Sequence, residues 1–431
     1  MDTDTVIIGG GLAGLNCARR LHAAGRSFIL LEAADRLGGR VRTETISTSE
    51  GDYLVDCGFQ VLLTAYPNAA EAFDYDALDL KCFYPGAMVF HDGQMHRVAD
   101  PRRRPGDALR GFRTPIATTR DKLRLAEMSL RVLAGPVENL WARPDRSAID
   151  ALREEGFAST TIDRFFRPFF GGVFFDPDLE TSSRMLEFTY RMFAQGRTCV
   201  PARGMAALPA QIARRLPADS VQVDSRVDRL ERTSNGWTVQ TTDRSVSATN
   251  IVVAVEGGTA RTLMSPHATV DAKPVRWRQT ATIAYACDKP PTEEAILVLD
   301  GQGEGPINHL ASMSVASPAY APKGKHLVYA NVIDPTMLAA AMDDEVLDDV
   351  ARPQLRRWFG EQVDGWRAIN VDRIDHALPD QSPPWLSTPQ RPVEMGGGLF
   401  ACGDWLDNAS IDGALASGSR CAQAVLDRTP A

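Results

Sequence analysis

The chain has 431 residues, enough for two or three domains, and its 44% hydrophobic and 24% charged residues are ordinary proportions for a globular protein. The formal net charge of -8 argues against a nucleic-acid partner, because binding to nucleic acid requires a basic face. No apolar run approaches the length of a transmembrane helix, and the first predicted strand begins too near Met1 to leave room for a signal peptide. We therefore expect a cytoplasmic protein.

The N-terminal stretch carries the strongest pattern. Residues 6–8 predict a short buried strand, and a run of glycines then turns the chain into an apolar-periodic segment typical of a helix. The glycines fit G-x-G-x-x-G, with Gly9, Gly11 and Gly14 in its three places. In this pattern the first glycine permits the tight turn, the second lets a pyrophosphate approach the backbone, and the third lets helix and strand pack closely. The helix start then offers N–H groups and a positive dipole end to the phosphates.

The context of the motif supports this interpretation. Residues 27–31 predict a second strand, and Glu32 ends it 18 residues after Gly14, close to the spacing at which an acid binds a ribose hydroxyl. A glycine-rich turn with an ordinary surface glutamate is the alternative, but it does not explain strand, helix, strand and acid in register. The sequence therefore predicts an adenine dinucleotide site.

A second pair of glycines follows at Gly38 and Gly39, and Arg40 comes directly after them. Adjacent glycines allow close backbone approach, and the planar guanidinium can pair with a phosphate; a simple turn with a solvated arginine is the alternative. G-x-G-x-x-G, an acid at the end of the second strand and then R-x-G-G-R together resemble the start of the flavin-containing amine oxidase and phytoene desaturase superfamily. The resemblance implies that the dinucleotide is FAD.

Residues 43–46 and 53–56 flank a polar turn and predict a hairpin. The residues that follow, 56–60, resemble the D-x-G element of the same superfamily. This resemblance implies that Gly58 lies beside the flavin ring, and a plain turn glycine is the alternative.

Helical patterns dominate residues 72–196, most clearly at 120–134, 148–155 and 160–170. Residues 165–177 contain an unusual number of phenylalanines and resemble the P-x-x-x-G-V-x-x-x-D-P segment of protoporphyrinogen oxidase-like and desaturase-like members. Such a stripe is either part of the hydrophobic core or the wall of an apolar substrate channel.

A basic stretch stands out in this acidic chain. Its arginines are Arg97, Arg102, Arg103, Arg104, Arg110, Arg113, Arg120 and Arg124. Such a run is usually a solvated face; the alternative is a patch that contacts a membrane surface, where arginines favour anionic lipid. The sequence leaves both open.

Residues 201–209 resemble the P-x-G-G-M-x-x-L element that returns the chain to the FAD-binding domain. Arg203 replaces the first glycine of that element, so we expect the local backbone to differ. Residues 221–227 predict a strand, and the resemblance implies that the backbone of Val227 passes the adenine. Residues 251–255 predict another short buried strand.

The following region, about residues 274–384, predicts strands at 280–287, 295–299 and 326–332 and a helix at 345–359. A second G-x-G-x-x-G is missing from the interior of the sequence. Its absence argues against a pyridine-nucleotide reductase, which needs a separate NAD(P)H-binding fold.

The last predicted strand, residues 398–402, is followed by Gly403 and Asp404, and Ser410 is placed to cap a C-terminal helix. This region resembles the A-G-D … E-G-A-x-x-S-G motif of the superfamily. The resemblance implies that Asp404 accepts hydrogen bonds from the ribityl hydroxyls. It also implies that the helix start, with Ile411 and Gly413, faces the flavin and stabilises its reduced, negatively charged form. A terminal strand and helix that only close a sheet are the alternative.

The seven cysteines are scattered, and none forms C-x-x-C. This spacing supports neither a zinc ribbon nor a dithiol redox pair, and it fits a reducing compartment. The cysteine-linkage motif of amine oxidases is not visible, so we expect non-covalent FAD.

These features predict an α/β flavoprotein with a Rossmann-like FAD-binding domain of the glutathione-reductase and amine-oxidase type. Residues 1–72, 196–262 and 386–431 form this domain. Residues 73–195 and 263–385 form a discontinuous α+β substrate domain. No metal site and no catalytic side chain is predicted, since we recognise no paired carboxylates, metal-ligand cluster or activated nucleophile.

Three functions remain open. The first is an FAD-dependent dehydrogenase or desaturase that removes a hydride from an apolar, isoprenoid-type molecule. The second is an amine oxidase. In that group a tyrosine forms an aromatic wall at the position of Ser410, and the nearest aromatic here is Trp405, which favours the first function. The third is a redox-neutral isomerase or a scaffold that holds FAD.

Overall fold

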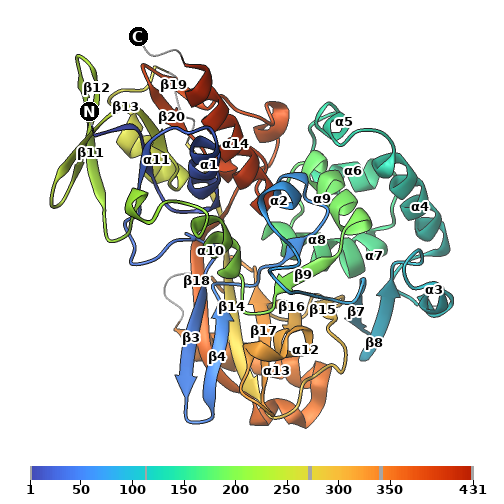
Figure 1. Ribbon diagram of the computed structural model, residues 1–431. Helices are drawn as coiled ribbons and strands as arrows, with labels where there is room; N and C mark the ends of the chain where they lie inside the picture. Colours follow the sequence, from blue (N-terminus) through green and yellow to red (C-terminus); the bar gives the residue numbers. More distant parts are fainter. Residues whose placement is uncertain (1, 112–113, 270–273, 339–342, 429–431) are drawn as a thin grey trace.

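A computed structural model describes residues 2–111, 114–269, 274–338 and 343–428. Its strands form two large sheets, one of eight strands and one of seven. In Figure 1 the eight-stranded sheet lies at the top, the seven-stranded sheet at the bottom, and a group of helices at one side. The predicted α/β class is confirmed.

The eight-stranded sheet is built around a parallel centre. Its strands pair in the order β10 (Val221–Gln222), β2 (Phe28–Leu31), β1 (Thr3–Ile8), β13 (Ser245–Val253), β12 (Gly236–Thr241) and β11 (Val227–Thr233), with β20 (Leu399–Ala401) and β19 (Glu394–Gly396) branching from β13. Ile7 of β1 lies opposite Leu30 and Val252, in parallel register on both sides. All three side chains are fully buried, as parallel strands with two covered faces require.

The first and last long helices pack against each other beside this sheet. α1 (Leu12–Ala23) and α14 (Ile411–Asp427) cross closely at Gly418, where a Cβ atom would lie 2.3 Å from the Ala13 carbonyl oxygen. Only glycine fits at that distance. The crossing holds the N-terminal and C-terminal sequence motifs in one part of the fold (Figure 1).

The seven-stranded sheet takes its strands from two separate parts of the chain. They pair in the order β18 (Arg367–Pro379), β14 (Trp277–Cys287), β17 (His326–Val332), β16 (Ile307–Ser312), β15 (Leu297–Asp300), β7 (Gly86–His91) and β8 (Gln94–Ala99). Three strands and the helix predicted between residues 274 and 384 are confirmed as β14, β15, β17 and α13 (Asp344–Phe359). The prediction contained no counterpart of β7, β8, β16 or β18.

The helices at one side of Figure 1 lie between β8 and β9 in the sequence. They are α3 (Pro105–Gly111), α4 (Thr119–Leu133), α5 (Glu138–Trp141), α6 (Ala148–Glu154), α7 (Ser159–Thr161), α8 (Arg167–Phe174) and α9 (Ser183–Gln195). α4 and α6 confirm two predicted helices. The helix predicted at 160–170 is instead α7, a π-helical turn at Ile162–Phe166 and the start of α8 in succession.

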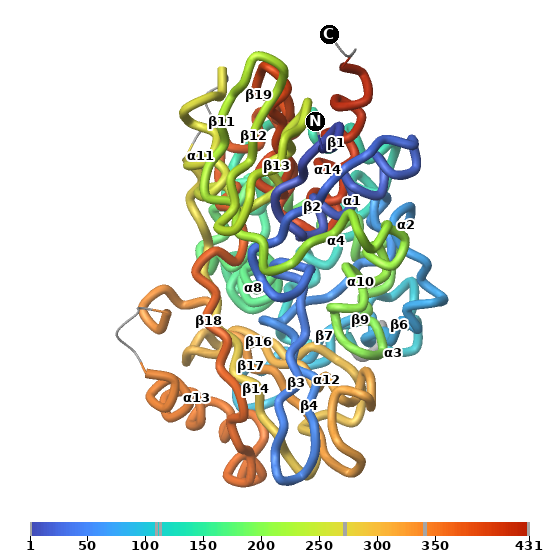
Figure 2. The backbone as a smooth tube through the Cα atoms, turned by 60° about the vertical axis from the view of Figure 1, so that its left-hand side comes forward, coloured from blue at the N-terminus to red at the C-terminus, as the bar shows by residue number. Residues whose placement is uncertain are grey.

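A hairpin and a small sheet connect the two large sheets. The predicted hairpin is confirmed as β3 (Thr43–Thr48) and β4 (Gly51–Asp56). At its tip, Glu50 pairs with Lys325 at 2.8 Å and also with Arg367, which fixes the tip beside the seven-stranded sheet (Figure 2). The small sheet contains β5 (Leu62–Leu63), β9 (Thr198–Pro201) and β6 (Leu80–Cys82).

The strands of the two large sheets come from different segments of the chain. The segments assigned to the FAD-binding domain supply the strands of the eight-stranded sheet, and the two other segments supply those of the seven-stranded sheet. The boundaries themselves remain predictions.

The remaining α-helices of the described chain are α2 (Pro67–Ala72), α10 (Ala207–Ala213), α11 (Gly257–Met264) and α12 (Met313–Ala316). None of the helices in the described ranges is long and apolar enough to cross a membrane.

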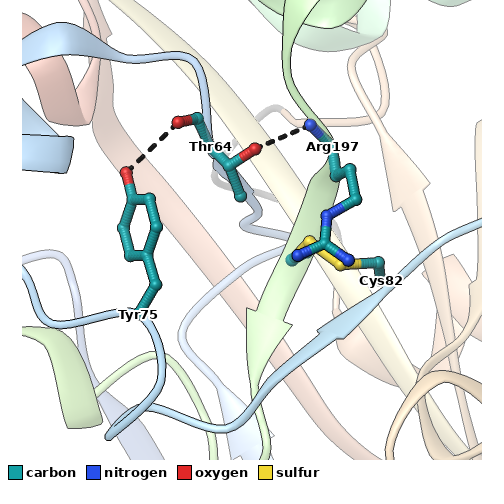
Figure 3. Close-up of a disulfide and its surroundings, with 5 residues drawn as sticks. Thr64, Tyr75, Cys82 and Arg197 are labelled. Atoms are coloured by element: carbon teal, nitrogen blue, oxygen red, sulfur yellow. Dashed lines mark hydrogen bonds between the residues drawn. A yellow bond between two sulfur atoms is a disulfide. The ribbon is translucent and has the colours of Figure 1, made fainter.

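One disulfide corrects the interpretation of the cysteines. Cys82 in β6 and Cys199 in β9 lie opposite each other in the small sheet and are bonded, although 117 residues separate them. Figure 3 shows Arg197 beside this bond, with its backbone N–H donating to Thr64 Oγ1 at 2.8 Å. The expectation that scattered cysteines fit a reducing compartment therefore loses its support. Local spacing cannot reveal a pair that strand pairing brings together.

Candidate active site

A cavity of about 2020 Å³ is lined by strands of the seven-stranded sheet, by the helical group, and by residues that follow the strand ends of the eight-stranded sheet. Ten of the thirteen predicted cofactor-binding residues line it: Gly9, Gly11, Glu32, Gly38, Gly39, Arg40, Gly58, Gly403, Asp404 and Ile411. Ligand pockets commonly measure about 300–1,000 Å³, so this cavity has room for a dinucleotide and a second molecule.

The turn between β1 and α1 has the form that a phosphate cradle requires. Gly9 has a φ of +109°, in the region that favours glycine. Gly14 packs inward, because a Cβ atom there would lie 2.1 Å from the Gly9 carbonyl oxygen. At Gly11 a Cβ atom would meet nothing within 4 Å, and no side chain caps the start of α1. An uncapped helix start beside open space suits an anion.

Glu32 lies at the end of β2, where the pattern places the ribose-binding acid. Its carboxylate accepts hydrogen bonds from the backbone N–H groups of Gly10 at 2.6 Å and Ala34 at 2.9 Å. These bonds hold the carboxylate against the glycine turn while the side chain remains part of the cavity wall.

The chain that passes the end of β2 differs from the prediction. The strand predicted at 221–227 is two strands, β10 and β11, and Val227 begins β11 and is absent from the residues that line the cavity. Asp224, with a φ of +51°, turns the chain between them. Ser225 N donates to the Glu32 carbonyl oxygen at 2.8 Å. The backbone bonded to Glu32 therefore belongs to Gln222 and Ser225, not to Val227.

The second glycine turn packs against the first. Gly38 N donates to the Gly10 carbonyl oxygen at 2.9 Å, and Gly38 and Gly39 have φ angles of +120° and +59°. Arg40, which follows them, donates to Asp404 Oδ1 at 2.7 Å and to the Ala377 carbonyl oxygen at 2.8 Å. The guanidinium that we expected to meet a phosphate therefore joins the N-terminal motif to the C-terminal one.

The start of α14 faces the cavity through Ile411. Ser410 caps this helix as predicted, since its Oγ accepts from Gly413 N at 3.0 Å. Gly413 does not itself line the cavity; a Cβ atom there would lie 1.9 Å from the Asn408 carbonyl oxygen, so it packs the helix start against the preceding loop. Asp404, just before that loop, is buried.

The predicted D-x-G element holds Gly58 at the cavity. Asp56 is fully buried and accepts hydrogen bonds from the hydroxyls of Thr43 at 2.5 Å and Tyr320 at 2.7 Å. It also accepts from Met205 N at 2.8 Å. Burial raises the pKa of Asp56 to about 6. Gly58, two residues later, has a φ of +76° and lines the cavity, so the carboxylate fixes the turn that carries it.

The phenylalanine-rich segment lies partly in the hydrophobic core and partly in the wall of the cavity. Phe165 and Phe169 are stacked with ring centroids 5.6 Å apart and line the cavity. Phe166 and Phe174 lie in the hydrophobic core and are 1% and 4% exposed. Residues four apart share one side of a helix, so one segment supplies a core face and a cavity wall.

Two cavity residues were missed by the sequence analysis. His309 in β16 is almost fully buried, with Nδ1 2.9 Å from Asn308 Oδ1 and its ring centroid 5.0 Å from that of Phe59. Burial lowers the pKa of His309 to about 3, so the imidazole is neutral. Tyr66 lines the cavity and interacts through its hydroxyl with Ser410. Neither belongs to a recognisable motif, and we find no sequence signal for either.

Trp405 does not line the cavity. It lies in the core of the eight-stranded sheet, and its indole N–H donates to the Val255 carbonyl oxygen at 3.3 Å. In the described parts of the chain, no group of His, Cys, Asp and Glu side chains could hold a metal ion.

The basic stretch reaches the edge of the cavity. Arg102, Arg103 and Arg104 line it, whereas Arg97 and Arg124 each form an ion pair with a carboxylate. Arg113 and the side chain of Arg110 lie outside the described residues, and Arg120 is exposed.

The family follows from comparison with known proteins. The family model described as "Flavin containing amine oxidoreductase" matches residues 12–426. The chain belongs to this family. It is therefore a flavin-dependent oxidoreductase, and the predicted resemblance is confirmed.

Relatives within the family are distant. The 15-cis-phytoene desaturase of Narcissus pseudonarcissus is 23% identical over 482 residues, which cover 98% of this chain and 79% of the desaturase. The crystal structure of a putative protoporphyrinogen oxidase from Exiguobacterium sp. 255-15 matches with a TM-score of 0.75 at 17% identity, covering 99% of this chain and all of the other. Cyclohexylamine oxidase from Brevibacterium oxydans IH-35A matches with a TM-score of 0.72 at 18% identity, with 99% and 100% coverage. The two structures show a shared fold.

Proposed function

We propose that this enzyme binds FAD non-covalently and removes a hydride from an apolar, isoprenoid-type substrate. The observation that carries the proposal is the stacked pair Phe165 and Phe169 in the wall of the cavity that also contains the FAD-binding motifs. Aromatic walls recognise extended apolar molecules by burying their surface. FAD supplies the acceptor of the hydride, and the chain supplies binding and orientation.

The cavity residues fit FAD. The uncapped start of α1 and the open space at Gly11 suit its pyrophosphate. Asp404 and Ile411, at the start of α14, line the same cavity and are the residues expected to contact the ribityl chain and the flavin. Cys57 is the free cysteine among the described cavity-lining residues. Burial raises the pKa of its thiol, which keeps it protonated and unreactive toward a flavin. Yellow colour that stays in the protein precipitate after acid treatment would contradict non-covalent binding.

An amine oxidase is the second candidate, and one observation favours it. Position 410 is a serine and Trp405 lies in the core, so neither forms an aromatic wall. Tyr66, however, brings an aromatic ring to Ser410 from another part of the chain. Phe165 and Phe169 in the cavity wall favour the apolar substrate, and Tyr66 favours the amine.

Anaerobic titration of the flavin separates these functions. The purified enzyme is mixed without oxygen with isoprenoids in detergent and, separately, with primary and secondary amines, while the flavin absorbance is recorded. We expect isoprenoids to bleach the flavin and amines to leave it oxidised. Rapid reduction by a simple amine and none by an isoprenoid would replace the first candidate with the second. Substrate turnover without bleaching would identify the redox-neutral isomerase.

A further inference from the structure

The solvent side of α4 is unusually apolar for a surface helix. Leu123 and Leu130 are 60% and 75% exposed, the largest values among the exposed large hydrophobic side chains of the described chain. Ala126 lies between them and is also exposed. We call the exposed side chains of α4 from Leu123 to Leu130, together with Arg102, Arg103, Arg104 and Lys122, the mouth surface.

The mouth surface is continuous with the cavity. Lys122, Ala126 and Leu130 recur every four residues on α4, so they share one side of the helix, and all three line the cavity. Leu130 therefore lines the cavity and is also more exposed to solvent than Leu123. A residue with both properties lies where the cavity opens to solvent.

Charge at this opening is opposite to the charge of the whole chain. Four basic residues of the mouth surface line the cavity, Arg102, Arg103, Arg104 and Lys122, in a chain whose net charge is -8. Arg102 and Arg103 share the single carboxylate of Asp100, at 2.9 Å and 3.7 Å. Arg104 lies over the Tyr84 ring at 5.1 Å. Glu127 is the exposed acid on the same part of α4, so the mouth surface keeps a positive balance.

We propose that the mouth surface docks on a lipid bilayer that contains anionic headgroups. Apolar side chains flanked by arginine and lysine are the combination that binds such a surface, because the leucines enter the acyl region while the cations meet the headgroups. Docking in this way places the cavity opening against the bilayer, so an apolar molecule reaches Phe169 without crossing water. The proposed docking depends only on the residues of the mouth surface. The entry of the substrate from the bilayer rests, in addition, on the proposed function.

Vesicle flotation of the full-length, FAD-loaded protein tests the docking. The probes are neutral phosphatidylcholine vesicles and vesicles with about one third phosphatidylglycerol. Each basic residue near an anionic surface contributes about 1 kcal/mol, or roughly fivefold in partition. We therefore expect at least tenfold stronger binding to anionic vesicles, which high salt abolishes. Substituting Arg102→Gln together with Arg104→Gln should weaken it at least fivefold.

The leucines have a matched control on another helix. Leu123→Ser with Leu130→Ser should reduce vesicle binding at least tenfold. Val346→Ser with Val350→Ser removes two exposed valines from α13, which lies far from α4 in Figures 1 and 2, and should leave binding unchanged. The ratio of flavin to protein absorbance and the melting temperature of each variant show that it folds and keeps FAD.

Three results would overturn the docking. Equal binding to neutral and anionic vesicles would remove the role of the arginines, and equal losses in the α4 and α13 variants would remove the role of α4. If sedimentation shows a dimer that the leucine variants convert to a monomer, a second copy of the chain covers this surface instead. Vesicle binding needs no substrate, so its failure is separate from a failure of the isoprenoid titration.

Discussion

The Arg40 guanidinium donates to Asp404 Oδ1 across 2.7 Å, and this bond joins two motifs that lie 364 residues apart in the sequence. Both side chains line the cavity, and Asp404 is buried whereas Arg40 is partly exposed. The pair therefore fixes the position of the Asp404 carboxylate, which follows β20, relative to the glycine turns. A dinucleotide that binds along both motifs contacts the glycine turns with its pyrophosphate and Asp404 with its ribityl chain. The distance between the two motifs decides whether one molecule makes both contacts.

Asp404→Ala should lower FAD affinity roughly ten- to hundredfold. A hydrogen bond to a charged group is worth about 1.5–3 kcal/mol, and Asp404 is expected to accept such bonds from the ribityl hydroxyls. Titration of the apoprotein with FAD, followed by flavin fluorescence, measures the change. An unchanged affinity would show that the C-terminal motif does not hold the ribityl chain.

Substitution of two glycines in the first motif should affect two different properties of the protein, its stability and its affinity for FAD. Gly14→Ala places a Cβ atom 2.1 Å from the Gly9 carbonyl oxygen, so α1 must move away from β1 and the melting temperature should fall. Gly11→Ala meets no atom within 4 Å and should leave the apoprotein's melting temperature unchanged, while its methyl group enters the expected path of the pyrophosphate and weakens FAD binding. The two variants are each other's control. Unchanged FAD affinity in Gly11→Ala would contradict the phosphate site.

The sequence predicted what depends on neighbouring residues. The glycine turns, Glu32, Asp404 and the cap at Ser410 are local patterns, and ten predicted residues meet in one cavity. β18 escaped prediction because it is an edge strand with few buried side chains, so it lacks apolar alternation. His309 and Tyr66 reach the cavity through contacts between distant segments, which one sequence cannot show. Val227 lies outside the cavity lining, because the chain turns at Asp224, which has a positive φ, between β10 and β11.

Two phenylalanines of one segment, one in the core and one in the cavity wall, separate packing from substrate contact. Phe166→Ala empties a core site that is 1% exposed and should cost about 3–5 kcal/mol of unfolding free energy. Phe169→Ala removes a cavity-wall ring, so it should raise KM for an apolar substrate while lowering the melting temperature far less. Denaturant unfolding and steady-state kinetics measure the two effects. Equal destabilisation with an unchanged KM would place Phe169 in the core rather than at the substrate.

The disulfide should be visible in solution. Under denaturing conditions without reductant, a thiol assay should count the five cysteines that are free in the structure, and seven after reduction. A crosslink between two cysteines 117 positions apart restricts the unfolded chain, and native disulfides typically contribute about 2–4 kcal/mol. Cys82→Ser with Cys199→Ser should therefore lower the melting temperature, while Cys287→Ser, at a buried free cysteine, tests substitution alone. Seven free thiols before reduction would contradict the bond.

Asp56 should make the stability of the protein depend on pH. Its pKa rises from 3.8 to about 6 in the folded protein, because burial disfavours the charged form. A carboxyl group with a raised pKa adds stability that is fully present below pH 3.8 and is lost as the pH rises through about 6. The two pKa values correspond to a loss on the order of 3 kcal/mol.

Comparison with Asp56→Asn isolates this contribution. The amide does not titrate, so the variant carries a fixed cost from its altered bonds to Thr43 and Met205, and all other groups titrate in both proteins. Between pH 4 and pH 7 the wild type should lose unfolding free energy relative to the variant. Denaturant titrations at half-unit pH steps give the difference. A gap between the two proteins that stays constant over this range would mean that Asp56 keeps an ordinary pKa, and that its three hydrogen bonds offset its burial.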